Sequence, residues 1–153
     1  MDRIYTEKLT STGTSMLFLA LAALFISLGA WRSTLVGWRT FPVIFLVLGL
    51  LFVFYVLNYR VLELALTAEE LKLKFGLVRW TLPLVNIAEI REDDSTMVIR
   101  YGGAGVHFAF VRGMYRAYFN FLEYPRLLAV FRQRRGPVQG LVFSTRQPDQ
   151  VLK

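Results

Sequence analysis

The sequence contains no cysteine and a single histidine, His107. The absence of cysteine excludes disulfide bonds, thiolate catalysis and thiolate metal ligands. A lone imidazole cannot hold a metal ion without carboxylate or histidine partners nearby. We therefore expect neither a metal centre nor a cofactor.

Charged residues are missing from two long stretches, residues 9–31 and 40–59. Their centres read "SMLFLALAALFISLGAW" and "FPVIFLVLGLLFVFYVL". A helix needs about 20 apolar residues to cross the hydrocarbon layer, where each backbone amide must bond within its own segment. The stretches predict two transmembrane helices at about 15–32 and 41–59, and the short linker predicts a tight antiparallel hairpin.

Aromatic and basic residues flank both stretches, as interfacial anchors do. The predicted anchors are Trp31, Arg32, Trp38, Arg39, Tyr55, Tyr59 and Arg60. One alternative is a cleaved signal peptide, with Arg3 and Lys8 as its basic region. Another is a pair of buried core helices, although neither stretch shows the polar face of a soluble helix. The second apolar run follows the first at once, which favours the membrane hairpin.

The Lys and Arg residues near the ends of the helices predict the orientation. The side with both termini carries six, and the linker carries only Arg32 and Arg39. The six are Arg3, Lys8, Arg60, Lys72, Lys74 and Arg79. We expect a multi-pass protein of the inner membrane with both termini in the cytoplasm. Residues 1–14 are then a cytoplasmic tail.

Residues 61–153 have the pattern of short strands. Leu71, Leu73 and Phe75 alternate with Lys72 and Lys74, a period of two that places the lysines on a solvent face. Strands are also expected in "LVRWTLPL", "TMVIRYGG", "VHFAFVRG", "YRAYFNFLE", "LLAVFRQR" and "GLVFSTR", whereas "NIAEIREDDS" runs into an acidic turn. Pro148 predicts the start of a C-terminal helix, with Asp149 in its first turn. The pattern predicts a mainly-β domain of roughly seven strands ending in a short helix.

The order of these motifs resembles the bacterial pleckstrin-homology-like domains. The resemblance rests on "LTAEELKLKFG", "PLVNIAEI", "YGGAGVHFAFVRGMYRAYFNF" and "LVFSTRQPDQVL", and it covers about residues 66–153. It implies a strongly bent, barrel-like sheet of seven strands closed by a C-terminal helix. This chain leaves room for only a few helical residues, which departs from the family pattern. The family shares no catalytic residues that could be carried over.

Acidic residues are scarce in the second half of the chain. Residues 100–153 carry nine Lys and Arg against only Glu123 and Asp149, which accounts for the net charge of +7. The candidate contacts with an anionic lipid or an acidic partner are Arg126, Arg132, Arg134, Arg135 and Arg146. The alternative is a solvated turn whose charge prevents edge strands from aggregating. Nucleic acid is not expected, because no recognition helix or stacking platform is present.

Other polar motifs carry little chemistry. Gly102–Gly105 ("GGAG") lacks the Lys-Ser/Thr pair of a phosphate-binding loop and reads as a hairpin turn. The acidic run 92–94 matches no calcium loop and reads as a solvated turn. Ser144 and Thr145 have no base placed beside them by any motif, and His107 reads as packing. No enzyme is expected.

Two functions remain from this reading. The first is a non-enzymatic, membrane-anchored accessory or scaffold protein, a subunit or assembly factor of a larger membrane complex. The second is a sensor of anionic lipid headgroups. An autonomous transporter is disfavoured, because the apolar stretches hold no ionisable residue that could line a path.

Overall fold

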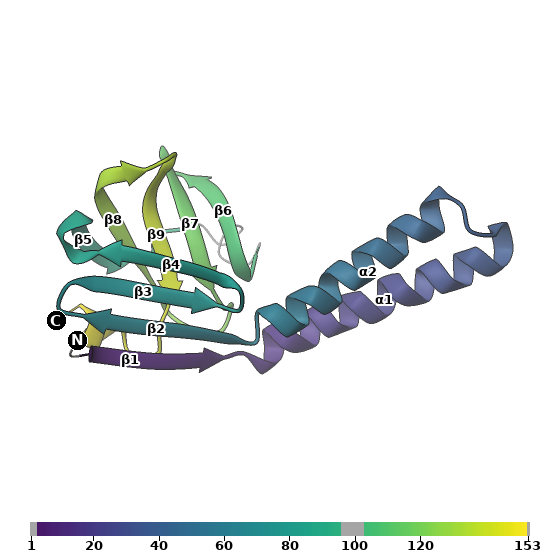
Figure 1. Ribbon diagram of the computed structural model, residues 1–153, viewed down its shortest axis with the longest axis horizontal. Coiled ribbons are helices and arrows are strands. Elements are labelled where there is room, and N and C mark those ends of the chain that lie inside the picture. The colour runs from purple at the N-terminus through teal and green to yellow at the C-terminus, as the bar shows by residue number, and fades with distance from the viewer. Residues whose placement is uncertain (1–2, 96–102, 153) are drawn as a thin grey trace. The chain divides into compact units, whose positions relative to one another are not determined.

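The computed structural model describes residues 3–95 and 103–152, which form two compact units. Residues 12–60 form a helical unit, and residues 3–11 join those from 61 onward in a β unit (Figure 1). The predicted strand "TMVIRYGG" and the start of the Gly102–Gly105 turn lie largely outside the described residues.

The helical unit is an antiparallel pair, α1 (Thr12–Val36) and α2 (Thr40–Asn58). Gly37, with φ +69°, makes the turn, and its N–H donates to the Ser33 carbonyl over 2.9 Å. Gly49 lets the helices approach closely, because a Cβ there would lie 2.5 Å from Cγ1 of Ile26. The predicted hairpin of two long apolar helices is confirmed, and α1 extends beyond the predicted range at both ends.

The outer surface of this pair is apolar. The most apolar 18 residues of α1 and α2 have mean hydropathies of 2.0 and 2.6, and only 22% and 11% of them are buried. Large exposed side chains include Leu24, Trp31, Val47, Leu50 and Leu57. Both helices are thus long and apolar enough to cross a membrane, and neither is enclosed as a core helix of a soluble protein would be.

Sheet A of the β unit contains four antiparallel strands in the order β1-β2-β3-β4. They are β1 (Arg3–Thr10), β2 (Val61–Thr67), β3 (Glu70–Phe75) and β4 (Val78–Pro83). Gly76, with φ +60°, makes the β3–β4 turn that the sequence predicts. The helical pair is inserted in the chain between β1 and β2, whose ends Thr10 and Val61 are paired.

The assignment of residues 1–14 to a tail is wrong for residues 3–10, which form strand β1. The period-two pattern is hidden there, because the polar Glu7 and the amphipathic Tyr5, both partly buried, share the inner face with the buried Leu9. Strand β2 was also missed, since its first residues follow the second apolar stretch directly. Strands β1 and β2 pair with each other, so neither could be recognised as a strand without its partner.

Sheet B contains five strands in the order β5-β8-β9-β7-β6. They are β5 (Ile87–Glu92), β6 (Gly105–Val111), β7 (Met114–Asn120), β8 (Arg126–Arg135) and β9 (Val138–Ser144); the short helix η1 (Leu84–Asn86) links the sheets. Strands β7 and β9 are parallel, and the other neighbours are antiparallel. The described chain thus has nine strands in two sheets rather than about seven in one barrel, and they form no closed barrel. The sequence shows which residues alternate but not which strands pair.

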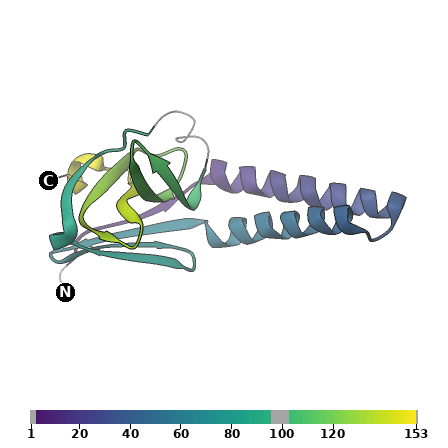
Figure 2. The same cartoon turned by 90° about the horizontal axis from the view of Figure 1, so that it is seen from above.

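The two sheets pack face to face, with their strands crossing in Figure 1 and the layers visible in Figure 2. Leu64, Leu73 and Phe75 of sheet A are buried, as are Phe119 and Phe121 near β7. The rings of Phe75 and Phe121 meet edge to face at 4.9 Å between centroids. Each such side chain contributes about 1.5–3 kcal/mol by leaving water, so this layer stabilises the unit.

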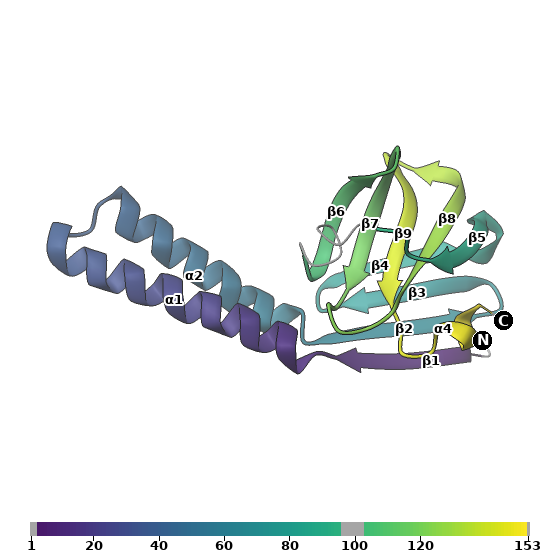
Figure 3. The same cartoon turned by 180° about the vertical axis from the view of Figure 1, so that it is seen from behind.

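The chain ends in α4 (Pro148–Val151), which begins at proline as predicted. Just before it, Oγ1 of Thr145 donates to Oε2 of Glu7 over 2.7 Å, and the N–H of Arg146 donates to Oε1 over 2.9 Å. Figure 3 shows α4 beside the start of β1. Strand β1 is therefore held by the end of the chain as well as by β2.

Candidate functional site

The arginine-rich tip, defined as Arg132, Arg134 and Arg135 at the end of β8, is held against the link between the sheets. Nδ2 of Asn86 donates to the Gln133 carbonyl over 3.0 Å, and the Gln133 N–H donates to Oδ1 of Asn86 over 2.8 Å. These two bonds stand in for strand pairing where the β8–β9 register shifts. The tip is therefore fixed to η1.

Two of the three arginines already donate hydrogen bonds to backbone carbonyls, and one of these two also contacts an aromatic ring. Nε of Arg132 donates to the Ile87 carbonyl over 3.0 Å. The Arg135 guanidinium donates to the Thr81 carbonyl and lies 5.8 Å from the Trp80 ring centroid, a cation–π contact. Arg134 has no hydrogen bond or ion pair within the described chain and is exposed.

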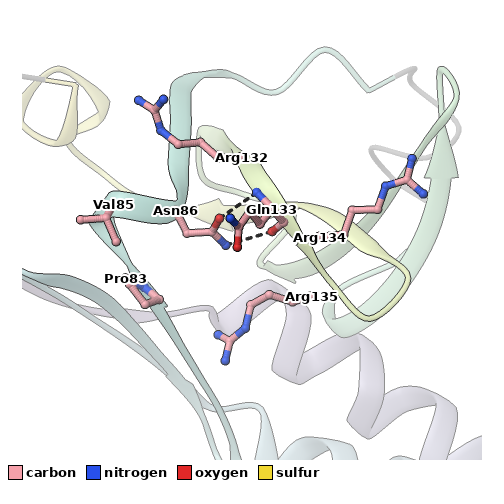
Figure 4. Close-up of a pocket in the computed structure, with 7 residues that line it drawn as sticks. All are labelled: Pro83, Val85, Asn86, Arg132, Gln133, Arg134 and Arg135. Carbon is pink, nitrogen blue, oxygen red and sulfur yellow. Dashed lines mark hydrogen bonds between the residues drawn. The ribbon is translucent and has the colours of Figure 1, made fainter.

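A pocket of about 440 Å³ opens beside the tip, and Figure 4 shows the side chains around it. It is lined by Pro83, Val85, Asn86, Arg132, Gln133, Arg134 and Arg135. The three guanidiniums point in different directions rather than toward one point (Figure 4). The tip can attract an anionic surface, but it does not form the bidentate clamp that would hold a single phosphate tightly.

The remaining two candidates lie elsewhere. Arg146 is exposed, donates from Nη2 to the hydroxyl of Tyr124 over 3.1 Å and lies 5.2 Å from that ring's centroid. Arg126 is only 6% exposed, and its Nε lies 3.5 Å from Oδ2 of Asp93. Arg126 lines a pocket of about 430 Å³ with Glu92 and Glu123, but its low exposure and its carboxylate neighbour make it a weaker candidate contact than the exposed arginines.

Asp93 is part of an interior ion cluster that the sequence analysis missed. Arg116 is 1% exposed, and its Nη1 lies 2.7 Å from Oδ1 of Asp94 and 3.4 Å from Oδ1 of Asp93. The hydrogen bond from Arg116 lowers the pKa of Asp94. The interpretation of Asp93 and Asp94 as a solvated turn was therefore wrong, although Glu92 is exposed. The one sequence signal for this cluster was the acidic run "EDDS", which begins at the last residue of β5 and could pair with buried cations.

His107 and Tyr118 lie next to this cluster. Their rings stack with 4.8 Å between centroids and 9° between planes, and the Tyr118 hydroxyl lies 2.9 Å from Oγ of Ser95. Burial, with a smaller effect of the Arg126 charge, lowers the pKa of His107. Burial raises the pKa of Tyr118. Both groups are thus uncharged at neutral pH, and the packing interpretation of His107 fits the stacking.

The hydroxyls of Ser144 and Thr145 serve structure. Ser144 is fully buried, accepts the Phe121 N–H over 3.1 Å and donates to the Phe121 carbonyl. Thr145 bonds to Glu7, a partly buried carboxylate. The described residues contain no group of three or more His, Cys, Asp and Glu that could hold a metal ion.

The predicted interfacial anchors fall into an exposed group and a more buried group. Trp31 and Trp38 are 60% and 72% exposed, and Arg32, Arg39 and Arg60 are also exposed. At the other end of the pair, Tyr59 is only 9% exposed, and its ring lies 5.4 Å from that of Tyr55. Tyr59 therefore packs rather than reaching outward, whereas the tryptophans have the exposure that an interfacial belt requires.

No protein-family model, curated protein or solved structure matches this chain.

Proposed function

We propose that the chain is a non-enzymatic, membrane-anchored accessory or scaffold protein, a subunit or an assembly or regulatory factor of a larger membrane complex. Its helical pair spans the inner membrane twice and tethers a PH-like β unit on the cytoplasmic side. The observation that carries the proposal is an apolar, mostly exposed helical pair inserted between two paired strands. In a membrane, lipid would cover the exposed apolar surface of α1 and α2, whose contact with water is unfavourable.

The β1–β2 ladder supports an even number of crossings. Thr10 and Val61 are register partners, so the segments on both sides of the helical pair must lie on the same side of a membrane. The ladder also argues against a cleaved signal peptide. Cleavage near Trp31 would remove β1, including the fully buried Leu9 and the Glu7 carboxylate that binds Thr145.

The engagement of the polar groups supports a role without catalysis. The interior cations face carboxylates, and the buried hydroxyls of Ser144 and Thr145 bond to the backbone and to Glu7. The β unit exposes charged side chains together with a few large apolar ones, such as Leu77, Val85 and Phe110, and such a surface suits recognition of a partner or a lipid. The lipid-sensor function is the second candidate, favoured by the exposure of Arg132 and Arg134.

Topology can be tested with single cysteines, because the chain has none of its own. In intact bacterial spheroplasts, a membrane-impermeant maleimide should label Trp38→Cys but not Val85→Cys. Val85 should be labelled only after the membrane is opened. A full-length chain that stays soluble without detergent, or labelling of Val85 from outside, would refute the proposed anchoring or its orientation.

Partnership is tested by purifying the full-length tagged chain from its native membrane in a mild detergent. An accessory subunit should bring down a larger membrane complex in a fixed stoichiometry. Recovery of the chain with lipid alone would contradict the accessory function and leave the lipid-sensor function. Substitution of Arg132, Arg134 and Arg135 by Gln then separates a contact made by the arginine-rich tip from one made elsewhere.

A further inference from the structure

Four residues form a row across the outer face of sheet A, one from each strand. Lys8 is paired in register with Glu63, Glu63 with Lys74, and Lys74 with Arg79. Nζ of Lys8 lies 3.1 Å from one oxygen of Glu63, and Nζ of Lys74 lies 3.6 Å from the other. We call Lys8, Lys74 and Arg79 the cationic row; a single carboxylate stands among them.

The cationic row borders a hollow in the sheet face. The next register row on the same face, two positions along each strand, contains Thr6, Ala65, Lys72 and Thr81, of which three are small. A cavity of about 490 Å³ lies over both rows. Arg79 is exposed and has no hydrogen bond or ion pair within the described residues. The face thus offers an unengaged guanidinium beside two ammonium groups that share one counter-charge.

The row lies near the end of sheet A where the chain enters and leaves the helical pair. Thr10 and Val61 end the ladder two residues beyond Lys8 and Glu63. Lys8 precedes the first residue of α1 by four positions, a span of at most about 14 Å when fully extended. Chain connectivity alone therefore keeps Lys8 within a short distance of any bilayer that α1 enters, and Lys74 and Arg79 follow two and three strands further across the sheet, at about 4.8 Å a strand.

The same end of the sheet carries an exposed leucine. The β3–β4 turn follows Phe75, which pairs with Leu62 near the start of β2 (Figure 3). Leu77 at the tip of this turn is 80% exposed. At the opposite end of β4, Val85 is 84% exposed and lies beside the arginine-rich tip. The two apolar tips are matched in exposure but lie at opposite ends of one strand.

We propose that this end of sheet A docks on anionic lipid headgroups, with the cationic row binding their phosphates and Leu77 entering the interfacial layer. The inference rests on the proposed membrane insertion of the helical pair. Two observations favour a bilayer as the occupant: the excess of cations over the single carboxylate in the row, and the short connection to the apolar helices. Tethering raises the effective concentration of headgroups, so modest individual contacts suffice.

The strength of the contact should follow the charge of the row. Each lysine or arginine near an anionic membrane surface shifts the ratio of docked to undocked chains about fivefold. Loss of all three cations of the row should therefore lower this ratio roughly a hundredfold. Substitution of Glu63 by Gln should raise it about fivefold, because the carboxylate repels the same headgroups.

The test uses the full-length chain in vesicles of phosphatidylcholine with or without phosphatidylglycerol. An environment-sensitive fluorophore is attached to Leu77→Cys, Val85→Cys or Leu50→Cys, and quenching by brominated lipids is measured. Leu50, 63% exposed in α2, reports insertion of the helical pair. We expect quenching at Leu50 in both lipids, at Leu77 only with phosphatidylglycerol, and not at Val85.

Two charge variants sharpen the result, and each removes three cations. Lys8→Gln/Lys74→Gln/Arg79→Gln should abolish quenching at Leu77, whereas Arg132→Gln/Arg134→Gln/Arg135→Gln should leave it unchanged. Unfolding followed by Trp80 fluorescence, in a Trp31→Phe/Trp38→Phe background, checks that both variants keep their fold.

The outcomes separate the two proposals. Quenching at Leu50 without quenching at Leu77 overturns headgroup docking and leaves membrane anchoring standing. No quenching at Leu50 refutes the anchoring itself. Equal quenching at Leu77 and Val85 also overturns docking by the cationic row. So does quenching at Leu77 that is the same with and without phosphatidylglycerol. If Leu77→Cys is shielded from maleimide in native membranes but not in vesicles with phosphatidylglycerol, this surface binds a protein partner and the lipid proposal is overturned.

Discussion

Two groups of arginines in the second half of the chain differ in burial and in partners. Arg116 and Arg126 lie inside, 1% and 6% exposed, and both face Asp93. The arginine-rich tip lies outside, and its guanidiniums meet only carbonyls, a ring or solvent. The sequence presents all of them as one basic excess, yet only the second group can act on a partner.

The two groups differ in how much free energy of unfolding is lost when the partner of a charge is removed. Breaking a buried ion pair leaves an uncompensated charge in a poorly polarisable interior, which costs about 3–5 kcal/mol. An exposed pair contributes about 0–1 kcal/mol, because water solvates each charge almost as well. The interior cluster should therefore govern the stability of the β unit, and the tip should hardly affect it.

The largest effect is expected from Asp93→Ala. Its side chain is 2% exposed, lies near both buried arginines and accepts a hydrogen bond from Oγ of Ser95 over 2.6 Å. Removal should lower the free energy of unfolding by about 3–5 kcal/mol, because two buried cations lose a shared counter-charge.

Urea unfolding in detergent micelles measures this, with Trp80 as reporter in a Trp31→Phe/Trp38→Phe background. Those substitutions leave a single tryptophan, which lies in the β unit. A loss below about 1 kcal/mol, the range of an exposed pair, would show that the cluster does not behave as a buried one.

Much of the fold was predictable, because helices and most strands are encoded locally. Two uncharged apolar stretches specified α1 and α2, and strict alternation specified β3 with its lysines outside. Gly76 and Pro148 marked a turn and a helix start through their backbone preferences. These signals need no knowledge of distant residues.

What escaped prediction depends on pairing between distant segments. Strand β1 is a strand because β2 lies beside it, although about fifty residues of helical pair separate them in the chain. Arg116 is buried because the residues after β5 bring Asp94 to it across the sheet. In the sequence, Arg116 and Arg134 look alike, and only the fold assigns one to the core and the other to the surface.

The next largest effect is expected from Asp94→Asn. Asp94 accepts charged hydrogen bonds from Arg116 at 2.7 Å and from Arg112 at 3.0 Å. Replacing the carboxylate should cost about 1.5–3 kcal/mol of unfolding free energy, the range for hydrogen bonds to charged groups. Urea midpoints at neutral pH measure the loss.

The same substitution should change the pH dependence of stability. The pKa of Asp94 is lowered in the folded protein by its bond from Arg116, so its contribution is fully present above the unfolded pKa of about 3.9. It is lost as the pH falls below that value through the folded pKa. The parent should therefore lose this stability below about pH 4, and the variant should lack this part of the acid dependence. Identical acid profiles would contradict it.

A smaller effect is expected at the turn beside the arginine-rich tip. Gly136 has φ +61°, and no atom lies within 4 Å of a Cβ built there. Gly136→Ala should therefore cost only the left-handed backbone penalty of about 1–2 kcal/mol, without a steric clash. Gly136→Asn is the matched control, because asparagine tolerates this conformation better. If alanine and asparagine cost the same, the turn does not hold this backbone conformation in solution.

The smallest effects are expected from the arginines of the tip. Arg135→Gln removes the hydrogen bond to the Thr81 carbonyl and the contact with the Trp80 ring, and loss of this exposed cation–π pair should cost about 0.5–1 kcal/mol. Arg134→Gln removes no contact within the described residues and should change the unfolding free energy by less than about 0.5 kcal/mol. Trp80 fluorescence should shift in the Arg135 variant alone, because only that guanidinium lies over the indole. A loss at Arg134 as large as that of Asp93→Ala would mean that the tip is engaged by the rest of the protein, and its charges would then not be available to a partner.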